Sequence, residues 1–198
     1  MKFIFYITGK SASGKDSVYK ALLEDKALQL SPIILYTTRP MRDGEKEGKE
    51  YHFADEDTYQ TLARNGEVIE CRTYNTIRGP WRYFTVSSAL DDNREYYLGI
   101  GTLESYLKIR DHFGKDRMVP IYIKVEDGER LKRAIDREIA SGKPDYKEMC
   151  RRYIADDEDF SEEKLLDAGV EGRFRFENKN LAACTEAIRS MIIGYQGK

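Results

Sequence analysis

The stretch FYITGKSASGKDSVYKALL, residues 5–23, places a loop of small residues between an apolar run and a segment with helical spacing. Lys2 to Thr8 has the aromatic and β-branched content of a buried strand, and Ser17 to Leu30 predicts a helix. Gly9 to Lys15 fits G-x-x-x-x-G-K, in which backbone N–H groups wrap a phosphate and the lysine reaches the outer phosphates. This order predicts the first βα unit of an α/β protein that binds a nucleotide.

The rest of the chain alternates short apolar runs with amphipathic segments. This alternation is typical of a parallel sheet with helices on both faces. The expected fold class is therefore α/β, a P-loop NTPase-type parallel sheet with an inserted subdomain and a lid. Further strands are predicted at 32–36, 67–74, 95–100, 118–125 and 173–178, and further helices at 55–66, 103–113, 128–140 and in a last segment ending near 193.

One region breaks the alternation. Residues 39–94 are rich in charge, turns and tyrosines, as expected of an inserted substrate-binding subdomain, and SGKPDY at 141–146 separates two charged helices like the tip of a lid. We expect a single domain over 1–198, with its core at 1–35, 95–135 and 160–198, the insertion at 36–94 and the lid at 136–159.

Charge and cysteine content restrict the partners and the compartment. The formal net charge of −2 argues against a chain held on nucleic acid or an acidic membrane by its overall field. Cys71, Cys150 and Cys184 have neither metal-ligand spacing nor a disulfide framework. The N-terminal apolar run is too short for a signal peptide. We expect a cytoplasmic protein with no nucleic acid and no membrane partner.

A second motif, YTTRPMRDGEKEGKEYHF at 36–53, indicates a phosphate clamp. Arg39 and Arg42 lie three apart around Pro40, and a glycine-bracketed loop leads from them to Tyr51. Two guanidinium groups and a phenol are well suited to hold a dianionic phosphate. The alternative is that these arginines solvate a surface loop beside its acidic residues.

The spacing of this motif resembles the guanylate kinase family. GEVIE at 66–70 is similar to the family's G-E-F-L-E, and RYFT at 82–85 is the nearest match to its Tyr-Gly-Thr/Ser element. The clamp motif itself is matched by Thr37, Thr38, Arg39, Arg42, Gly44, Glu45, Gly48, Tyr51 and Phe53. The resemblance covers most of the chain and is strongest from 36 to 70. It implies a phosphotransferase that uses ATP and GMP, acts as a monomer or homodimer, and binds the monophosphate in the insertion.

The resemblance also implies roles for individual residues. The GMP site would comprise Arg39, Arg42, Tyr51 and Tyr83 at the phosphate and Glu70 and Thr85 at the guanine. The ATP site would comprise Gly9, Lys10, Ser11, Ala12, Ser13, Gly14, Lys15, Asp16, Ser17 and Asn178. Catalysis would rest on Lys15, Arg39, Arg137 and Arg152. For the lid arginines the alternative is a helix surface laced with salt bridges.

Four positions depart from the family pattern. Leu35 stands where the family has a guanine-reading serine, and Gly99 and Gly101 stand where two aspartates usually end the middle strand. Asp16 replaces the Ser or Thr whose hydroxyl ordinarily binds Mg²⁺. Because a carboxylate is also an oxygen ligand that Mg²⁺ prefers, we expect Asp16 to be the metal residue. The departures leave two alternatives open: a kinase for another nucleotide or small phosphate compound, and a catalytically inactive binding module.

Overall fold

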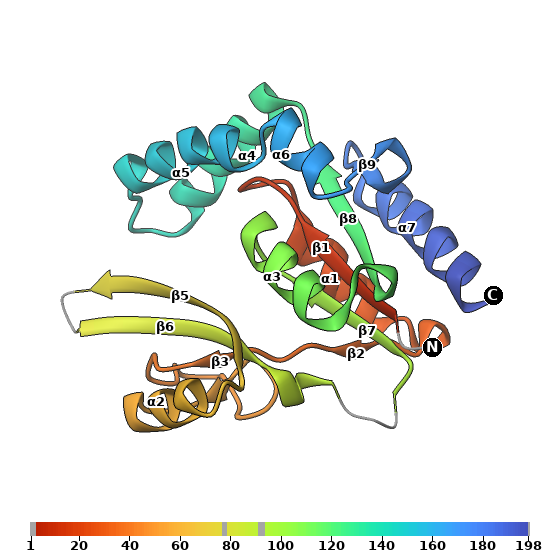
Figure 1. Cartoon of the computed structure of the whole chain (residues 1–198). Helices are drawn as coiled ribbons and strands as arrows, with labels where there is room; N and C mark the ends of the chain where they lie inside the picture. The colour runs from red at the N-terminus through yellow and green to blue at the C-terminus, as the bar shows by residue number, and fades with distance from the viewer. Residues whose placement is uncertain (1–2, 77–78, 91–93, 198) are drawn as a thin grey trace.

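The computed structural model describes residues 3–76, 79–90 and 94–197 and has the expected α/β architecture (Figure 1). Among these residues, five parallel strands form the larger sheet in the order β2-β7-β1-β8-β9. Its strands are β1 (Phe3–Thr8), β2 (Ser31–Pro32), β7 (Tyr96–Ile100), β8 (Met118–Lys124) and β9 (Arg175–Glu177). The predicted start of the first strand, Lys2, lies outside the described residues.

Helices cover the larger sheet on both faces. The central strands are buried almost throughout, as parallel strands covered on two sides must be. Figure 1 shows α1 and α3 beside the central strands and α7 along the β9 side. The helices are α1 (Lys15–Glu24), α3 (Leu103–Phe113), α4 (Asp127–Ala140), α5 (Tyr146–Asp159), α6 (Glu162–Asp167) and α7 (Leu181–Gln196).

A smaller sheet is built from the residues predicted as the insertion. Within the described residues its four strands run in the order β4-β3-β6-β5, and one helix, α2, packs beside them (Figure 1). The strands β5 and β6 pair antiparallel over most of their length. The elements are β3 (Tyr36–Thr37), β4 (His52–Phe53), α2 (Glu56–Arg64), β5 (Val68–Thr76) and β6 (Gly79–Val86).

Three predicted elements are wrong in extent. The single strand expected at 32–36 is two short strands in different sheets, because the chain passes from the larger sheet to the smaller one between Pro32 and Tyr36. The first helix ends at Glu24, where Asp25 turns extended and caps a separate 3₁₀ turn, Lys26–Leu28. A 3₁₀ turn also takes the start of the strand predicted at 173–178.

Candidate functional site

The phosphate loop, Gly9–Lys15, connects β1 to α1 and is held by the end of β9. The Asn178 amide donates from Nδ2 to the carbonyl of Ser13 at 2.9 Å. Gly14 has φ 84°, and a Cβ at this position would lie 2.5 Å from that same Nδ2. Both the left-handed backbone and the close approach therefore require glycine. Asn178, predicted at the nucleotide site, reaches it here through the loop backbone.

Lys15 and Asp16 begin helix α1. Lys15 Nζ lies 3.8 Å from Asp16 Oδ2, and the Asp16 side chain is 85% exposed. Among the described residues, His, Cys, Asp and Glu side chains form no group of three or more that could hold a metal. Asp16 and the Ser17 hydroxyl therefore offer oxygen ligands without a complete protein cage. This donor set fits Mg²⁺, which usually keeps water and takes further ligands from substrate phosphates.

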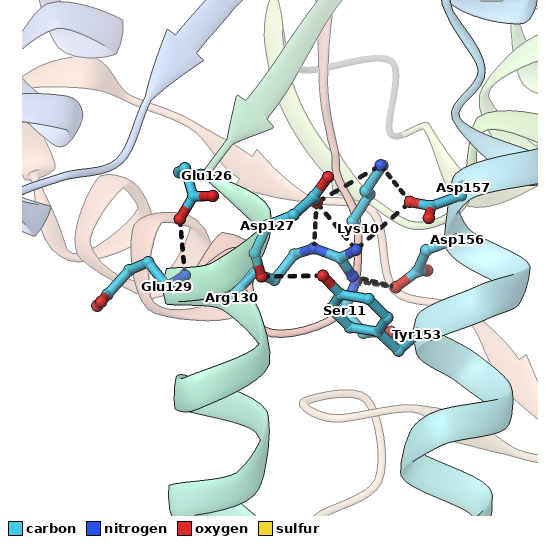
Figure 2. Close-up of polar contacts among 9 residues, drawn as sticks. All are labelled: Lys10, Ser11, Glu126, Asp127, Glu129, Arg130, Tyr153, Asp156 and Asp157. Carbon is cyan, nitrogen blue, oxygen red and sulfur yellow. Dashed lines mark hydrogen bonds and ion pairs between the residues drawn. The ribbon is translucent and has the colours of Figure 1, made fainter.

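Arg130 of α4 lies fully buried between the phosphate loop and α5 (Figure 2). Its guanidinium group pairs with Asp156 at 2.9 Å and with Asp127 at 3.1 Å. The face of the group packs on the ring of Tyr153, 3.9 Å from the ring centroid. A buried guanidinium needs such compensation, because its desolvation is otherwise costly.

The carboxylates of α5 also bind the phosphate loop (Figure 2). Asp156 Oδ2 accepts the backbone N–H of Ser11 at 2.8 Å, and Lys10 Nζ lies 2.5 Å from Asp157. The hydrogen bond from Lys10 lowers the pKa of Asp157. Loop and helix are thus joined although about three quarters of the chain separates them. Neither Arg130 nor these two aspartates was predicted from the sequence. The i, i+3 spacing from Asp127 to Arg130 is a local signal that could have indicated Arg130.

A cavity of about 260 Å³ lies between α4 and α5 beside Ser11 of the loop. Arg137 and Arg152, the two arginines predicted for the lid, both line it. Arg152 Nε donates to Glu148 at 2.7 Å, and hydrogen bonds from Arg151 and Arg152 lower the pKa of Glu148 to about 2. The structure therefore brings the predicted lid arginines to the loop, with Arg152 held by a carboxylate.

The arginine clamp is formed by Arg39, Arg42, Tyr51 and Tyr83. The Arg39 side chain is only 3% exposed and donates to both oxygens of Glu45, at 2.7 and 3.0 Å. Its Nε donates to the Tyr83 hydroxyl at 3.2 Å. These hydrogen bonds raise the pKa of Arg39 and lower the pKa of Glu45. Arg39 is thus a charged group fixed in one orientation.

The other clamp residues lie around this guanidinium group. The Tyr51 ring centroid is 5.5 Å from Arg39 Cζ, and the Tyr51 and Tyr83 rings meet edge to face at 5.6 Å. The Arg42 side chain is exposed, while its backbone N–H donates to Glu45 at 2.8 Å. Glu45, predicted only as part of the spaced motif, is thus the residue that orients Arg39.

Glu70 of β5 is buried and pairs with Thr85, two residues along β6 from Tyr83. Its Oε1 accepts from the Thr85 hydroxyl at 2.8 Å, and its Oε2 accepts from the Ser105 hydroxyl at 3.1 Å. Arg72 Nε lies 3.5 Å from Oε2. Glu70 and Thr85 were predicted at the base but not as partners of each other, and Ser105 was not predicted because it comes from α3, beyond the insertion. Thr102 caps that helix by accepting the Ser105 N–H.

The Tyr6 side chain fills the space beside Gly99 and Gly101, where the resemblance predicts aspartates. Tyr6 pairs with Gly99 across β1 and β7, and its side chain is almost fully buried. A Cβ on Gly99 would lie 2.5 Å from the Tyr6 ring, and a Cβ on Gly101 would collide with the Tyr6 hydroxyl. Burial raises the pKa of this phenol. Leu35, another of these departures, is half-buried.

The chain is similar to guanylate kinases in three comparisons with known proteins. A family model described as Guanylate kinase matches residues 3–170. The guanylate kinase of Anaplasma phagocytophilum is 30% identical over 173 residues, which cover 85% of this chain and 72% of that protein. The guanylate kinase of Thiobacillus denitrificans is 35% identical over 99 residues, covering 49% of this chain and 46% of that protein.

Two further matches are also guanylate kinases. The guanylate kinase of Chromohalobacter salexigens is 34% identical over 122 residues, 61% of this chain and 54% of that protein. The chain thus spans about half the length of several curated relatives it matches. The crystal structure of the Anaplasma phagocytophilum guanylate kinase has a TM-score of 0.66 at 20% identity, covering 100% of this chain and 87% of that one, which establishes the common fold.

Proposed function

Because this chain belongs to the guanylate kinase family, we propose that it transfers the γ-phosphoryl group of Mg·ATP to GMP, giving ADP and GDP. The observation that carries this proposal is the layout of the smaller sheet. Tyr83 of the arginine clamp and Thr85, the partner of Glu70, are two residues apart on β6 and so face the same side. A phosphate-binding end and a base-reading end therefore share one face.

The donor end is the phosphate loop. Its backbone N–H groups and the N-terminus of α1 would hold the ATP phosphates, with Lys15 at the outer phosphates. Asn178 supports this site through the Ser13 carbonyl. Arg137 and Arg152, which line one cavity beside the loop, would neutralise charge that develops on the transferred group. Catalysis would consist mainly of positioning and charge stabilisation.

Magnesium belongs to this proposal, with Asp16 as its protein ligand. When bound, the ion would neutralise phosphate charge. A carboxylate facing triphosphate oxygens without a cation is repelled by about 4 kcal/mol per unit pair at an effective dielectric of ~20 and about 4 Å. Asp16→Ser should therefore shift the Mg²⁺ concentration for half-maximal velocity, with Asp16→Asn as the isosteric control. Unchanged metal dependence and turnover in both variants would remove Asp16 from the metal site.

The compartment, the oligomeric state and the roles of the two inserted segments are part of the same proposal. We place the protein in the cytoplasm, acting as a monomer or homodimer without nucleic acid or membrane, and we assign 36–94 to NMP binding and 136–159 to the lid. The near-neutral charge supports the absence of a polyanionic partner. Within the described residues, no helix is long and apolar enough to cross a membrane.

A second candidate is a kinase for another nucleotide or small phosphate compound. Leu35, Gly99 and Gly101 favour it, because a guanine-reading hydroxyl and the two acids of the middle strand are absent. A coupled assay with ATP against GMP, dGMP, AMP, UMP and CMP separates the candidates. GMP should give the highest kcat/KM. Another preferred acceptor would establish the second candidate, and no turnover with any acceptor alongside phosphopeptide binding would indicate an inactive binding module.

A further inference from the structure

Arg72 lies on the same face of the smaller sheet as the residues predicted to bind the acceptor. It follows Glu70 by two positions on β5, so the two side chains project to one side. Across the ladder, Glu70 pairs with Thr85. Arg72 pairs with Tyr83 of the arginine clamp, and opposite residues of an antiparallel pair share a face. Arg72 therefore lies between the base-reading carboxylate and the clamp.

The guanidinium group of Arg72 has no hydrogen bond to another described residue. Its Nε is buried and lies 3.5 Å from Oε2 of Glu70 without forming a hydrogen bond. Thr85 and Ser105 instead donate to that carboxylate, one to each oxygen. A buried donor without an acceptor costs free energy. The Arg72 side chain is 21% exposed, so part of this cation remains accessible to a ligand beside Glu70.

Two other arginines of the insertion are held by carboxylates. Arg39 donates to both oxygens of Glu45, at 2.7 and 3.0 Å. Arg82 donates from Nε to Glu56 at 2.9 Å, and its side chain is 22% exposed. Since Arg72 is about as exposed as Arg82, its lack of a partner does not follow from its burial. It reflects the place of Arg72 beside the acceptor site.

Glu70 and Arg72 together match the hydrogen-bonding edge of guanine. That edge presents the N2 amino donor, the N1–H donor and the O6 acceptor side by side. Glu70 supplies two acceptor oxygens, and Arg72 lies beside Oε2. A base whose amino group faces Oε1 and whose N1–H faces Oε2 therefore directs O6 toward Arg72. The reverse orientation would place amino hydrogens against a guanidinium group, which has no acceptor.

Other donors for O6 on this face are already used or absent. The hydroxyl hydrogens of Thr85 and Ser105 are donated to Glu70. Leu35 stands where the family resemblance implies a guanine-reading serine, and it has no hydrogen to donate. A carbonyl that leaves water without gaining a hydrogen bond weakens binding. Arg72 supplies the donor that Leu35 does not.

We propose that Arg72 determines acceptor specificity by donating to the 6-oxo group of a purine monophosphate, beside the N1–H and amino group that Glu70 accepts. This rests on the proposed function, because the acceptor is taken to bind at Glu70. The ligand class is a 6-oxopurine nucleotide. The 6-amino group of AMP would face the guanidinium group donor to donor, so the same residue disfavours adenine.

The first test is calorimetric binding of GMP, IMP and 6-thio-GMP to the wild type and Arg72→Met. IMP keeps the 6-oxo group and lacks the amino group, whereas 6-thio-GMP keeps the amino group and carries sulfur, a weak acceptor, at position 6. In Arg72→Met we expect GMP affinity to fall about tenfold, the value of one hydrogen bond from a charged donor. The preference for GMP over 6-thio-GMP should fall about fivefold, while the preference for GMP over IMP stays unchanged.

Arg82→Met is the matched control. Arg82 is adjacent to Tyr83 on β6 and so lies on the opposite face, with nearly the same exposure as Arg72. It should leave both preferences unchanged. Equal losses for all three nucleotides in Arg72→Met would indicate a contact with the phosphate, and a loss only of the preference over IMP would indicate that Arg72 merely holds Glu70. Either result overturns the proposal.

The wild type alone provides a second test that does not depend on the folding of a variant. It should bind GMP about fivefold more tightly than 6-thio-GMP, because sulfur accepts the Arg72 hydrogen bond weakly. Equal binding of these two nucleotides would overturn this inference and leave the kinase activity, measured by the coupled assay, unaffected. Absent turnover with the preference intact would overturn the kinase activity alone.

Discussion

Replacing Asp156 by alanine should destabilise the chain strongly, because it strands a buried charge. The Arg130 side chain is 0% exposed and that of Asp156 is 12% exposed. Removing one partner of a buried ion pair costs about 3–5 kcal/mol. The lower end applies here, because Asp127 and Asp157 still face the guanidinium group at 3.1 and 3.5 Å. For a chain of this size, about 3 kcal/mol lowers Tm by about 6–12 °C.

The assay is thermal unfolding of the ligand-free chain at pH 7. Asp159→Ala makes the same chemical change at an exposed position of α5 and should alter stability by no more than about 0.5 kcal/mol. Adding Arg130→Met to Asp156→Ala should recover most of the loss, because an apolar side chain leaves no charge to desolvate. A Tm decrease below about 2 °C, or strictly additive losses in the double variant, would refute the reasoning.

Two further predictions follow from single contacts. Glu45→Ala frees Arg39 from both of its hydrogen bonds with the carboxylate. The coupled assay should therefore show the KM for GMP raised about tenfold and the KM for ATP unchanged. Equal increases in both KM values would contradict a role confined to the clamp. Burial raises the pKa of Cys184 to about 11. At pH 8, iodoacetamide should therefore modify the exposed Cys150 and leave Cys184 unmodified until the chain unfolds. Mass spectrometry of the alkylated protein measures this difference.

The main elements of the fold were predictable because their signals are local. The helix at 103–113 has the predicted bounds, with Thr102 as its cap. The prediction of a single strand at 32–36 is wrong, although its local signal was also present. Its apolar residues are buried or half-buried as the composition suggests, but the chain changes sheets within it. Hydrophobicity indicates burial, and it does not indicate which of two sheets a short strand will join.

The residues of the candidate site also fall into two groups, those that a local pattern predicts and those that it does not. The spaced motif at 36–53 located Arg39 and Glu45, which pair across six positions of one loop. The contacts of Arg130 with Asp156 and of Ser105 with Glu70 join separate elements. No periodicity within one helix or strand contains such a pair, so only the folded chain identifies it. The family resemblance identified residues that pair within one segment, such as Arg39 and Glu45. It gave no indication of pairs between separate elements.

Gly99 and Gly101 show why a departure from a family pattern needs its spatial partner before it can be interpreted. Considered alone, they are two lost carboxylates and suggest a decayed site. Next to Tyr6 they are the space into which the ring of that residue, from the neighbouring strand β1, fits. A side chain too large for an ordinary strand neighbour requires glycine opposite it. The packing of Tyr6 therefore accounts for Gly99 and Gly101, and their lack of side chains does not by itself indicate a decayed site.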